Sequence, residues 1–571
     1  MKFMKLGTRP DTFHTQQATR TVISDAPSDL VIKINNITYL IHKFPVLPKC
    51  GLLQRLCSNN GNNGEKITIE LNDIPGGEDG FEVCAKFCYG ITINLSAHNF
   101  VSAFCAANFL RMSESISEGN FIVKLESFFL SCILSGWKDS ILTLRSSSLG
   151  LSECSHNLGI TTKCIDSIVH KILTPPSKVT WSFTYTRPGY NKKNHRSVPK
   201  DWWTEDIADL DIDLFRCIIA AISSTCILPP PLIGEALHVY TCRWLSDVRD
   251  TSTSETEANA EKNRQILETI ISLIPPDRES VSASFSLRLL SLANVLGISQ
   301  VTKAEIIRRC SLLLAEATVS DLLFPSKSSA SKEEEEEEEE EDDDDDNNGQ
   351  CLYDVDLVVG VLESFLIVWR RNSDVENEEV LRSIRKVGEL IDCYLQVVAR
   401  DPNMSVAKMI YLAEALPDLA RPNHDHIYQA INIFLKEHPD ISKAEKKRLC
   451  RVLNCQKLSP EVRGHAVKNE RLPLRTVVQL LFFEQQIKGS KTSSRVAATQ
   501  HHGKQRPASD DQSVRDTKSR AEQKLRRSES TRSRPKVAED HKMKTTELIK
   551  QSIVESRRKE VVHKGEGRRG S

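Results

Sequence analysis

The spacing of apolar residues changes along this chain, and that change limits the folds it can adopt. From residue 29 to 41 apolar and polar residues alternate, and Asn35 and Asn36 divide the run into the two arms of a predicted β-hairpin. Extended and helical spacings then follow in turn, which predicts strands at 67–71 and 91–95 and helices at 42–57, 81–89 and 98–112. Beyond about residue 120 only helical spacing persists, in runs at 121–144, 153–173 and 212–227. An α+β domain followed by an all-α domain is therefore expected.

Two segments of the chain carry strong charge of opposite sign. The net charge of −1 hides fourteen consecutive acids, Glu333 to Asp346, and a segment 491–571 with 22 Lys and Arg against 11 Asp and Glu. Like charges at this density repel one another and stay solvated. We therefore expect a disordered acidic insert at 326–349 and a disordered basic tail at 487–571. A Pro-, Lys- and Asn-rich linker is expected at 174–199.

Known catalytic and targeting motifs are missing. The sequence has no complete phosphate-binding loop, no Cys-x-x-Cys, no Gly-x-Ser-x-Gly and no His-Glu-x-x-His. We expect no enzyme activity, no cofactor, no metal and, without zinc-finger spacing, no nucleic-acid partner. Residues 1–25 lack the apolar segment of a signal peptide, and no apolar stretch approaches the length of a membrane span. A cytoplasmic protein with sixteen mostly buried, reduced cysteines is expected.

The C-terminal half has well-marked helices. Ser442 and Glu445 form a predicted capping box, and Ser459 before Pro460 predicts another helix start. Two apolar stripes are predicted to face a core. They are Ile427, Ala430, Ile431, Phe434 and Leu435, and then Leu474, Val477, Val478, Leu481 and Phe482.

Several long motifs carry a family resemblance. The most unusual are residues 201–207, Asp-Trp-Trp-Thr-Glu-Asp-Ile, and residues 469–475, Asn-Glu-Arg-Leu-Pro-Leu-Arg. These two motifs resemble the plant BTB/POZ family named for non-phototropic-hypocotyl and root-phototropism mutants. Shorter motifs that also resemble this family lie at residues 28–29, 42–45, 87–90, 445–449 and 482–485. The opening residues 2–7 are similar to its auxin-organogenesis branch. The resemblance covers nearly all of residues 1–485.

That resemblance implies two modules. A BTB/POZ domain is expected at 29–97, with a helical extension to about 173, and a helical signature domain at 200–486. The chain would then be a substrate-specific adaptor of a cullin-3 RING E3 ubiquitin ligase in phototropic and auxin-transport signalling. The alternative is a plasma-membrane-associated signalling scaffold, regulated by an AGC-type kinase, with no ubiquitin role. One departure is that residues 97–100 lack the acid of the hydrophobic-x-acid triplet that cullin-binding BTB domains often carry.

The resemblance also points to candidate surfaces. The cullin-facing corner is expected at Phe87, Leu95, His98 and Phe100. Homo- or hetero-oligomers through the BTB domain are expected to use an exposed apolar set on its first helix, Leu52, Leu53 and Leu56. Trp202 and Trp203 are either a peptide-docking pair or, as we favour, a staple that packs the next helix onto its core.

Modification and membrane sites are expected in the C-terminal part. The family resemblance implies that Tyr428 is a phosphorylation site, and the alternative is an amphipathic tyrosine packed at a helix flank. Ser528 and Ser571 follow arginines, as basophilic kinases require, and a phosphate there would suit a 14-3-3 protein. Residues 541–564 combine an apolar stripe with basic residues, which predicts an amphipathic helix on anionic lipid or, equally, a plain basic tail.

Overall fold

The computed structural model describes residues 2–59, 66–148, 150–188, 190, 197–245, 257–326, 351–371 and 378–497, with side chains described as far as Gln485. The chain divides into a compact unit, 1–494, and a second unit, 495–571. The acidic insert from residue 327 on and the basic tail from residue 498 on lie outside the described residues. So do Ser528, Ser571 and the predicted helix at 541–564.

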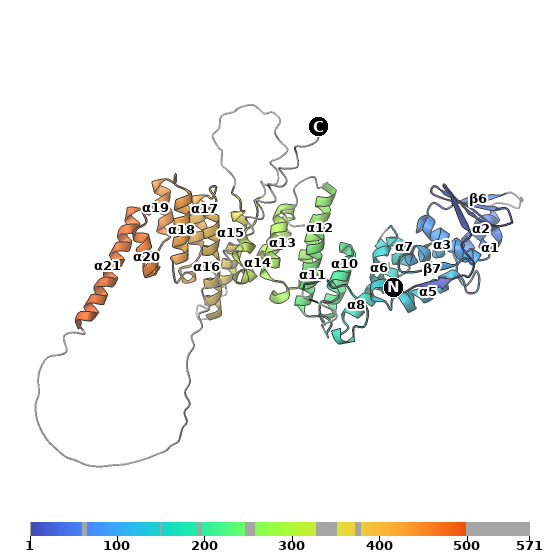
Figure 1. Cartoon of the computed structure of the whole chain (residues 1–571), viewed down its shortest axis with the longest axis horizontal. Coiled ribbons are helices and arrows are strands. Elements are labelled where there is room, and N and C mark those ends of the chain that lie inside the picture. Colours follow the sequence, from blue (N-terminus) through green and yellow to red (C-terminus); the bar gives the residue numbers. More distant parts are fainter. Residues whose placement is uncertain are drawn as a thin grey trace, which may run out of the picture. The chain divides into compact units, whose positions relative to one another are not determined.

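The N-terminal domain is built on two small sheets (Figure 1). A five-stranded sheet has the order β2-β3-β5-β4-β6, and a second sheet pairs β1 with β7. The predicted hairpin is confirmed as β4 and β5, where Ile32 faces Tyr39. The strands are β1 Met4–Leu6, β2 Phe13–Gln16, β3 Thr19–Val22, β4 Leu30–Ile34, β5 Ile37–Ile41, β6 Ile67–Glu70 and β7 Ile93–Leu95.

The domain begins earlier than the predicted residue 29. Strand β3 pairs in parallel with β5, and β1 pairs antiparallel with β7, so the first 22 residues complete both sheets. These strands were missed because each has three or four residues and most of their side chains are exposed or half-buried, which leaves almost no alternating pattern.

Helices of the N-terminal part pack against these strands and against one another. Tyr39 meets Phe81 of α3, with ring centroids 4.8 Å apart. The predicted run 121–144 is α5 and α6 joined by one π-helical turn, η1. The elements are α1 Lys43–Val46, α2 Gly51–Asn59, α3 Gly77–Tyr89, α4 Phe100–Phe109, α5 Phe121–Phe128, η1 Phe129–Ile133, α6 Trp137–Ser148, α7 Ser152–Asn157, α8 Ile160–Ile172 and η2 Pro176–Lys178.

The second part of the described chain is helical, as predicted. Neighbours in sequence pack together, for example α12 on α13, α13 on α14 and α14 on α15. The α-helices are α9 Thr204–Ile207, α10 Ile212–Thr225, α11 Pro230–Trp244, α12 Glu257–Leu273, α13 Ala283–Leu296, α14 Gln300–Leu313, α15 Val355–Arg371, α16 Glu378–Val398, α17 Val406–Ala415, α18 Asp425–Glu437, α19 Lys443–Arg451, α20 Pro460–Val467 and α21 Leu474–Ala497. Short 3₁₀ turns lie between them: η4 Arg278–Ser280, η5 Leu314–Glu316, η6 Val319–Leu322, η8 Asp418–Ala420 and η9 Cys455–Lys457.

The helix ends agree with the sequence, but one apolar stripe does not. The capping box of Ser442 and Glu445 is confirmed at the start of α19, and Ser459 caps α20. The stripe on α18 is buried. The stripe on α21 is wrong as a core face, because Leu474 is 78% exposed and Phe482 57% exposed, while Leu480 is the fully buried residue. Helix α21 also continues to Ala497, so residues 487–497 of the predicted tail are helical.

None of the helices in the described ranges combines the length and the apolar character that crossing a bilayer requires.

A glycine allows one close helix contact. A Cβ at Gly388 on α16 would lie 2.5 Å from the carbonyl oxygen of Ala420 in η8, whereas a Cβ at Gly464 on α20 would meet nothing within 4 Å. Neither residue has a positive φ. Gly388 is therefore required by packing and Gly464 is not.

We predict that Gly388→Ala destabilises the full chain by about 1–3 kcal/mol, since backbone must move to admit the methyl group. The matched variant Gly464→Ala should be neutral or stabilising by up to about 1 kcal/mol, because alanine favours a helix. Urea unfolding followed by circular dichroism measures both. Equal effects of the two substitutions would show that the α16–η8 contact is looser than described.

Candidate functional site

An aromatic cluster surrounds Trp202, where the helical extension meets the second domain. Trp202 and Trp203 are 1% and 0% exposed. The Trp202 ring lies 4.6 Å from that of Trp137 on α6 and 5.6 Å from those of Trp181 and Phe183. The favoured prediction, that the tryptophan pair packs into a core, is confirmed. A peptide-docking role for this pair does not fit its burial.

Asp206 supplies the polar centre of the same cluster. Its carboxylate is buried on α9 and accepts a hydrogen bond of 2.7 Å from Nε1 of Trp137 and one of 3.0 Å from the backbone N–H of Thr184. Nζ of Lys138 lies 4.0 Å from the other carboxylate oxygen. One side chain thus holds α6, the segment before residue 188 and α9 together. We call Trp137, Trp181, Phe183, Trp202 and Asp206 the junction cluster.

The described part of the predicted linker is fixed to the second domain. Arg187 forms ion pairs with Asp201, at 2.8 Å, and with Glu235 on α11, at 2.7 Å. The backbone N–H and hydroxyl of Thr186 donate to Glu205. Residues 181–187 therefore act as a packed strap, whereas the sequence had indicated a linker from 174 to 199.

The predicted cullin-facing corner is only partly a surface. Leu95 and Phe100 are fully buried, and Phe100 stacks on Phe129 with ring centroids 5.1 Å apart. Phe87 is half-buried and stacks on Phe121. Only His98 is exposed. Leu95 and Phe100 belong to the core, so truncating Phe100 would damage the core rather than test a contact.

The predicted dimerisation set is also internal. Leu53 is 0% exposed, Leu52 is 9% exposed and Leu56 packs against the same core. The expectation that these leucines are exposed is wrong, because the domain buries them itself. On α1, the large apolar side chain of Phe44 is 89% exposed.

Tyr428 is buried in a hydrogen-bond network. Its hydroxyl lies 2.7 Å from Nδ1 of His465 and accepts a hydrogen bond from Asn469 at 3.2 Å. Asn469 also donates to Asn432 on α18. This network favours the packing interpretation of Tyr428, since a kinase could reach its hydroxyl only after local opening.

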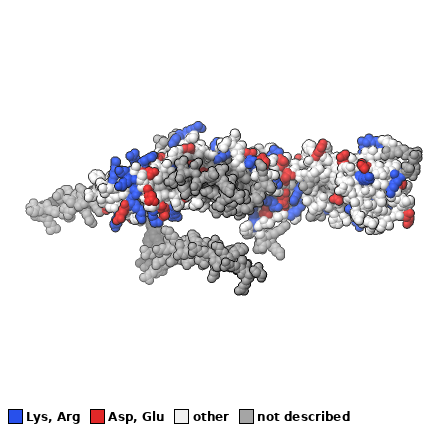
Figure 2. Space-filling model, turned by 90° about the horizontal axis from the view of Figure 1, so that it is seen from above, with Lys and Arg blue, Asp and Glu red and all other residues white. Residues whose placement is uncertain are grey.

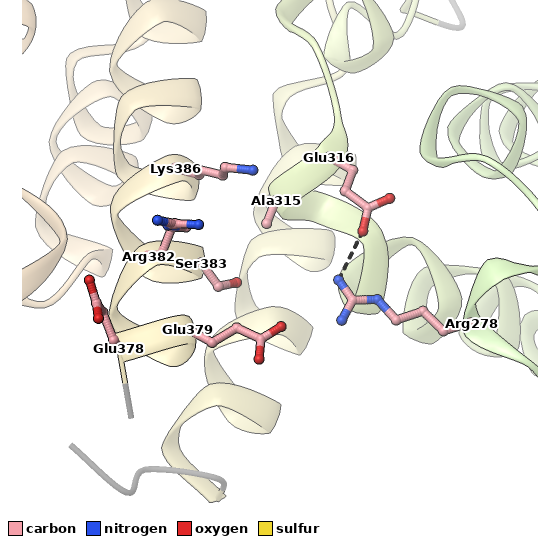
Figure 3. A pocket seen from close by; sticks show the side chains of 8 residues that line it. All are labelled: Arg278, Ala315, Glu316, Glu378, Glu379, Arg382, Ser383 and Lys386. Carbon is pink, nitrogen blue, oxygen red and sulfur yellow. Dashed lines mark hydrogen bonds and ion pairs between the residues drawn. The ribbon is translucent and has the colours of Figure 1, made fainter. Parts of the chain in front are cut away.

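Two hollows flank the exposed cations of α16. One has a volume of about 550 Å³ and lies between α16 and η5, where Glu316 pairs with Arg278 at 3.0 Å (Figure 3). The other has a volume of about 500 Å³ and runs along α16 to Asn423 and His426. Arg382 and Lys386 line both. Their i, i+4 spacing was visible in the sequence, but nothing there indicated the hollows.

Helix α19 carries a second positive surface. Lys443, Lys447, Arg448 and Arg451 are exposed, and none of them forms an ion pair within the described ranges. Figure 2 shows Lys and Arg side chains gathered over the end of the helical domain that holds α19. Such a surface attracts acidic peptides or anionic lipid headgroups. No three His, Cys, Asp or Glu residues of the described chain are placed to hold a metal ion.

A histidine with a shifted pKa, His424, is buried at the start of α18. Its Nδ1 accepts a hydrogen bond of 3.1 Å from the backbone N–H of Asn454. Burial, aided by the positive charges of Lys457 and Arg421, lowers the pKa of His424 to about 4. The carboxylates of Asp418 and Asp425 oppose this only in part. His424 is therefore neutral in the folded protein at neutral pH.

Comparison with known proteins finds a family match and relatives that agree with one another. Residues 201–462 match the NPH3 family. A BTB/POZ domain-containing protein of Arabidopsis thaliana is 58% identical over 519 residues, covering 89% of each chain. The phototropic-responsive NPH3 family protein NPY1 of the same plant is 37% identical over 551 residues, covering 93% of this chain and 90% of its own. Root phototropism protein 3 of Arabidopsis thaliana is 32% identical over 593 residues, covering 84% of this chain and 76% of its own.

For the junction cluster, we predict that Asp206→Ala destabilises the full chain by about 1–3 kcal/mol for each donor it leaves unpaired. Asp206→Asn should lower the free energy of unfolding by less than Asp206→Ala, because the asparagine side chain keeps one acceptor oxygen. Asp213→Ala, which removes an exposed carboxylate on α10, is the control and should change stability by less than about 0.5 kcal/mol. If denaturant unfolding finds Asp206→Ala as mild as Asp213→Ala, the junction cluster does not hold the two parts together.

For His424, the pKa is lower in the folded than in the unfolded chain, so the unfolded chain takes up the proton first. The stability it contributes is complete above pH 6.5 and is lost as pH falls toward 4. We predict that His424→Asn loses less stability than the parent between pH 6.5 and 4. His426→Asn, at an exposed site two residues on, should follow the parent. The measurement is unfolding free energy against pH, and parallel curves for all three proteins would contradict the assignment.

Proposed function

This chain belongs to the NPH3 family of BTB/POZ proteins, and from that premise we propose that it is a substrate-specific adaptor of a cullin-3 RING E3 ubiquitin ligase in phototropic and auxin-transport signalling. In this role the BTB domain forms oligomers and docks cullin-3, and the helical domain recruits the protein to be ubiquitinated. The adaptor performs no chemistry of its own.

The junction cluster is the observation that most supports an adaptor. An adaptor must hold its ligase-binding and substrate-binding parts in a defined relation, because ubiquitin transfer depends on where the substrate is presented. Asp206 accepts hydrogen bonds from α6 of the BTB extension and from the strap that is fixed to the second domain. The helical domain then offers the α16 hollows and the α19 cations as surfaces for an acidic or phosphorylated substrate segment.

The second candidate is a plasma-membrane-associated scaffold regulated by an AGC-type kinase, without a ubiquitin role. The exposed cations of α19 favour it, since each basic residue near an anionic bilayer adds about 1 kcal/mol of attraction. The predicted tail helix at 541–564 would add lipid contacts. Phosphates on Ser528 and Ser571, with a bound 14-3-3 protein, would release the tail.

To test the adaptor function, we predict that the full chain binds purified cullin-3 and that Asn94→Glu with His98→Glu weakens binding at least about tenfold. Asn94 on β7 and His98 just after this strand are both exposed, so new negative charges should disturb the docking corner but not the fold. His14→Glu, at an exposed histidine of β2, is the matched control and should bind normally. Binding is measured by titration calorimetry or surface plasmon resonance.

Two outcomes would contradict the adaptor function or the position of the docking corner. If the folded full chain does not bind cullin-3, the adaptor function fails and the scaffold remains. If the double variant binds as tightly as the parent, the docking corner lies elsewhere.

A further inference from the structure

An exposed cysteine on α11 lies among groups that stabilise a thiolate. Nε2 of His238 is 3.5 Å from Sγ of Cys242, one helical turn away. From α13, Nη1 of Arg288 donates to the same sulfur at 3.4 Å. Two nitrogen atoms from different helices therefore converge on one accessible sulfur.

The histidine is itself held in place. Its Nδ1 faces Oε1 of Glu235 at 3.8 Å, and Arg187 of the strap binds that carboxylate at 2.7 Å. Its ring packs edge-on against Phe285 of α13, with centroids 5.1 Å apart. The order Glu235, His238, Cys242 along one helix face places a carboxylate behind the imidazole and the thiol before it. In this geometry the imidazole holds a proton that it can share with the sulfur.

The pKa shifts of His238 and Cys242 also favour an ion pair between the imidazolium and the thiolate. The hydrogen bond to Cys242 and the nearby Glu235 raise the pKa of His238 to about 9. The hydrogen bond from His238 lowers the pKa of the Cys242 thiol, and the charge of Arg288 adds to this effect. Burial instead raises the pKa of thiols such as Cys84, Cys164 and Cys310.

Exposure separates Cys242 from those buried thiols, and its neighbours separate it from the other exposed ones. Cys217 and Cys226 are also exposed. Sγ of Cys226 contacts only the carbonyl oxygen of Ser223 among the described groups, and Cys217 has no described polar contact. Reactive cysteines are accessible and lie beside cationic groups, and Cys242 meets both conditions.

We propose that Cys242 is an oxidation site, at which the thiolate held by His238 and Arg288 reacts with hydrogen peroxide to give a sulfenic acid. The sulfur attacks one peroxide oxygen, an S–O bond forms and the O–O bond breaks. The departing hydroxide takes the proton from His238 and leaves as water. Sulfur loses two electrons and the peroxide gains them, so no further reactant is needed.

The thiolate is tested by alkylation of the reduced full chain with iodoacetamide between pH 5 and 9, followed by peptide mass spectrometry. At pH 7 Cys242 should react at least about tenfold faster than Cys217 and Cys226, because its lowered pKa leaves more of the sulfur as thiolate, the form that is alkylated. The two exposed cysteines are controls within the same molecule. Equal rates at the three sites would overturn the proposal.

The role of the histidine is tested with His238→Asn. This variant should move the pH midpoint of Cys242 alkylation upward, while the profiles of Cys217 and Cys226 stay in place. A change in packing alone would not produce a shift confined to Cys242. If the midpoint does not move, His238 does not stabilise the thiolate.

The oxidation itself is tested with hydrogen peroxide in the presence of dimedone, which traps sulfenic acids. Dimedone should label Cys242 before any other cysteine, and Cys242→Ser should remove this first label. Initial labelling elsewhere would overturn the assignment even if alkylation is fast. Because no step involves cullin-3, these results are independent of the adaptor function.

Discussion

The buried carboxylate of Asp206 joins the two parts of this molecule. A charge in a nonpolar site is tolerated only when it is hydrogen-bonded, and here Trp137 and Thr184 each donate to the same oxygen. Trp137 and Thr184 belong to different segments of the chain. If either segment moves away, the carboxylate of Asp206 loses one of its two hydrogen bonds. The rings around Trp202 exclude water from this contact, which strengthens it.

The strap extends this connection into the helical domain. Arg187 links Asp201, next to Trp202, to Glu235 on α11, and Glu235 faces the histidine that contacts Cys242. The junction and the reactive thiol are therefore neighbours in one series of polar contacts. The positive surfaces of α16 and α19 lie on later helices, apart from this series in the sequence.

Local patterns predicted the elements well and their partners less well. The alternation that ends at Ile41 identified the hairpin, and Ser442 with Glu445 identified the start of α19, because each signal lies within a few residues. Apolar spacing identifies a face without saying what covers it. For this reason Leu53 was assigned to an interface although it is buried, and Leu474 to a core although it is exposed. Asp206 was missed as a junction because its donor on Trp137 is 69 residues away in sequence.

The junction cluster makes the BTB extension and the helical domain open as one unit. Hydrogen exchange of the full chain, followed by mass spectrometry across a series of low denaturant concentrations, tests it directly. The amides of α6 and α10, on either side of the cluster, should exchange with the same opening free energy and the same denaturant dependence. If the amides of one helix exchange through an opening that leaves the other protected, the two parts are independent and the junction cluster does not couple them.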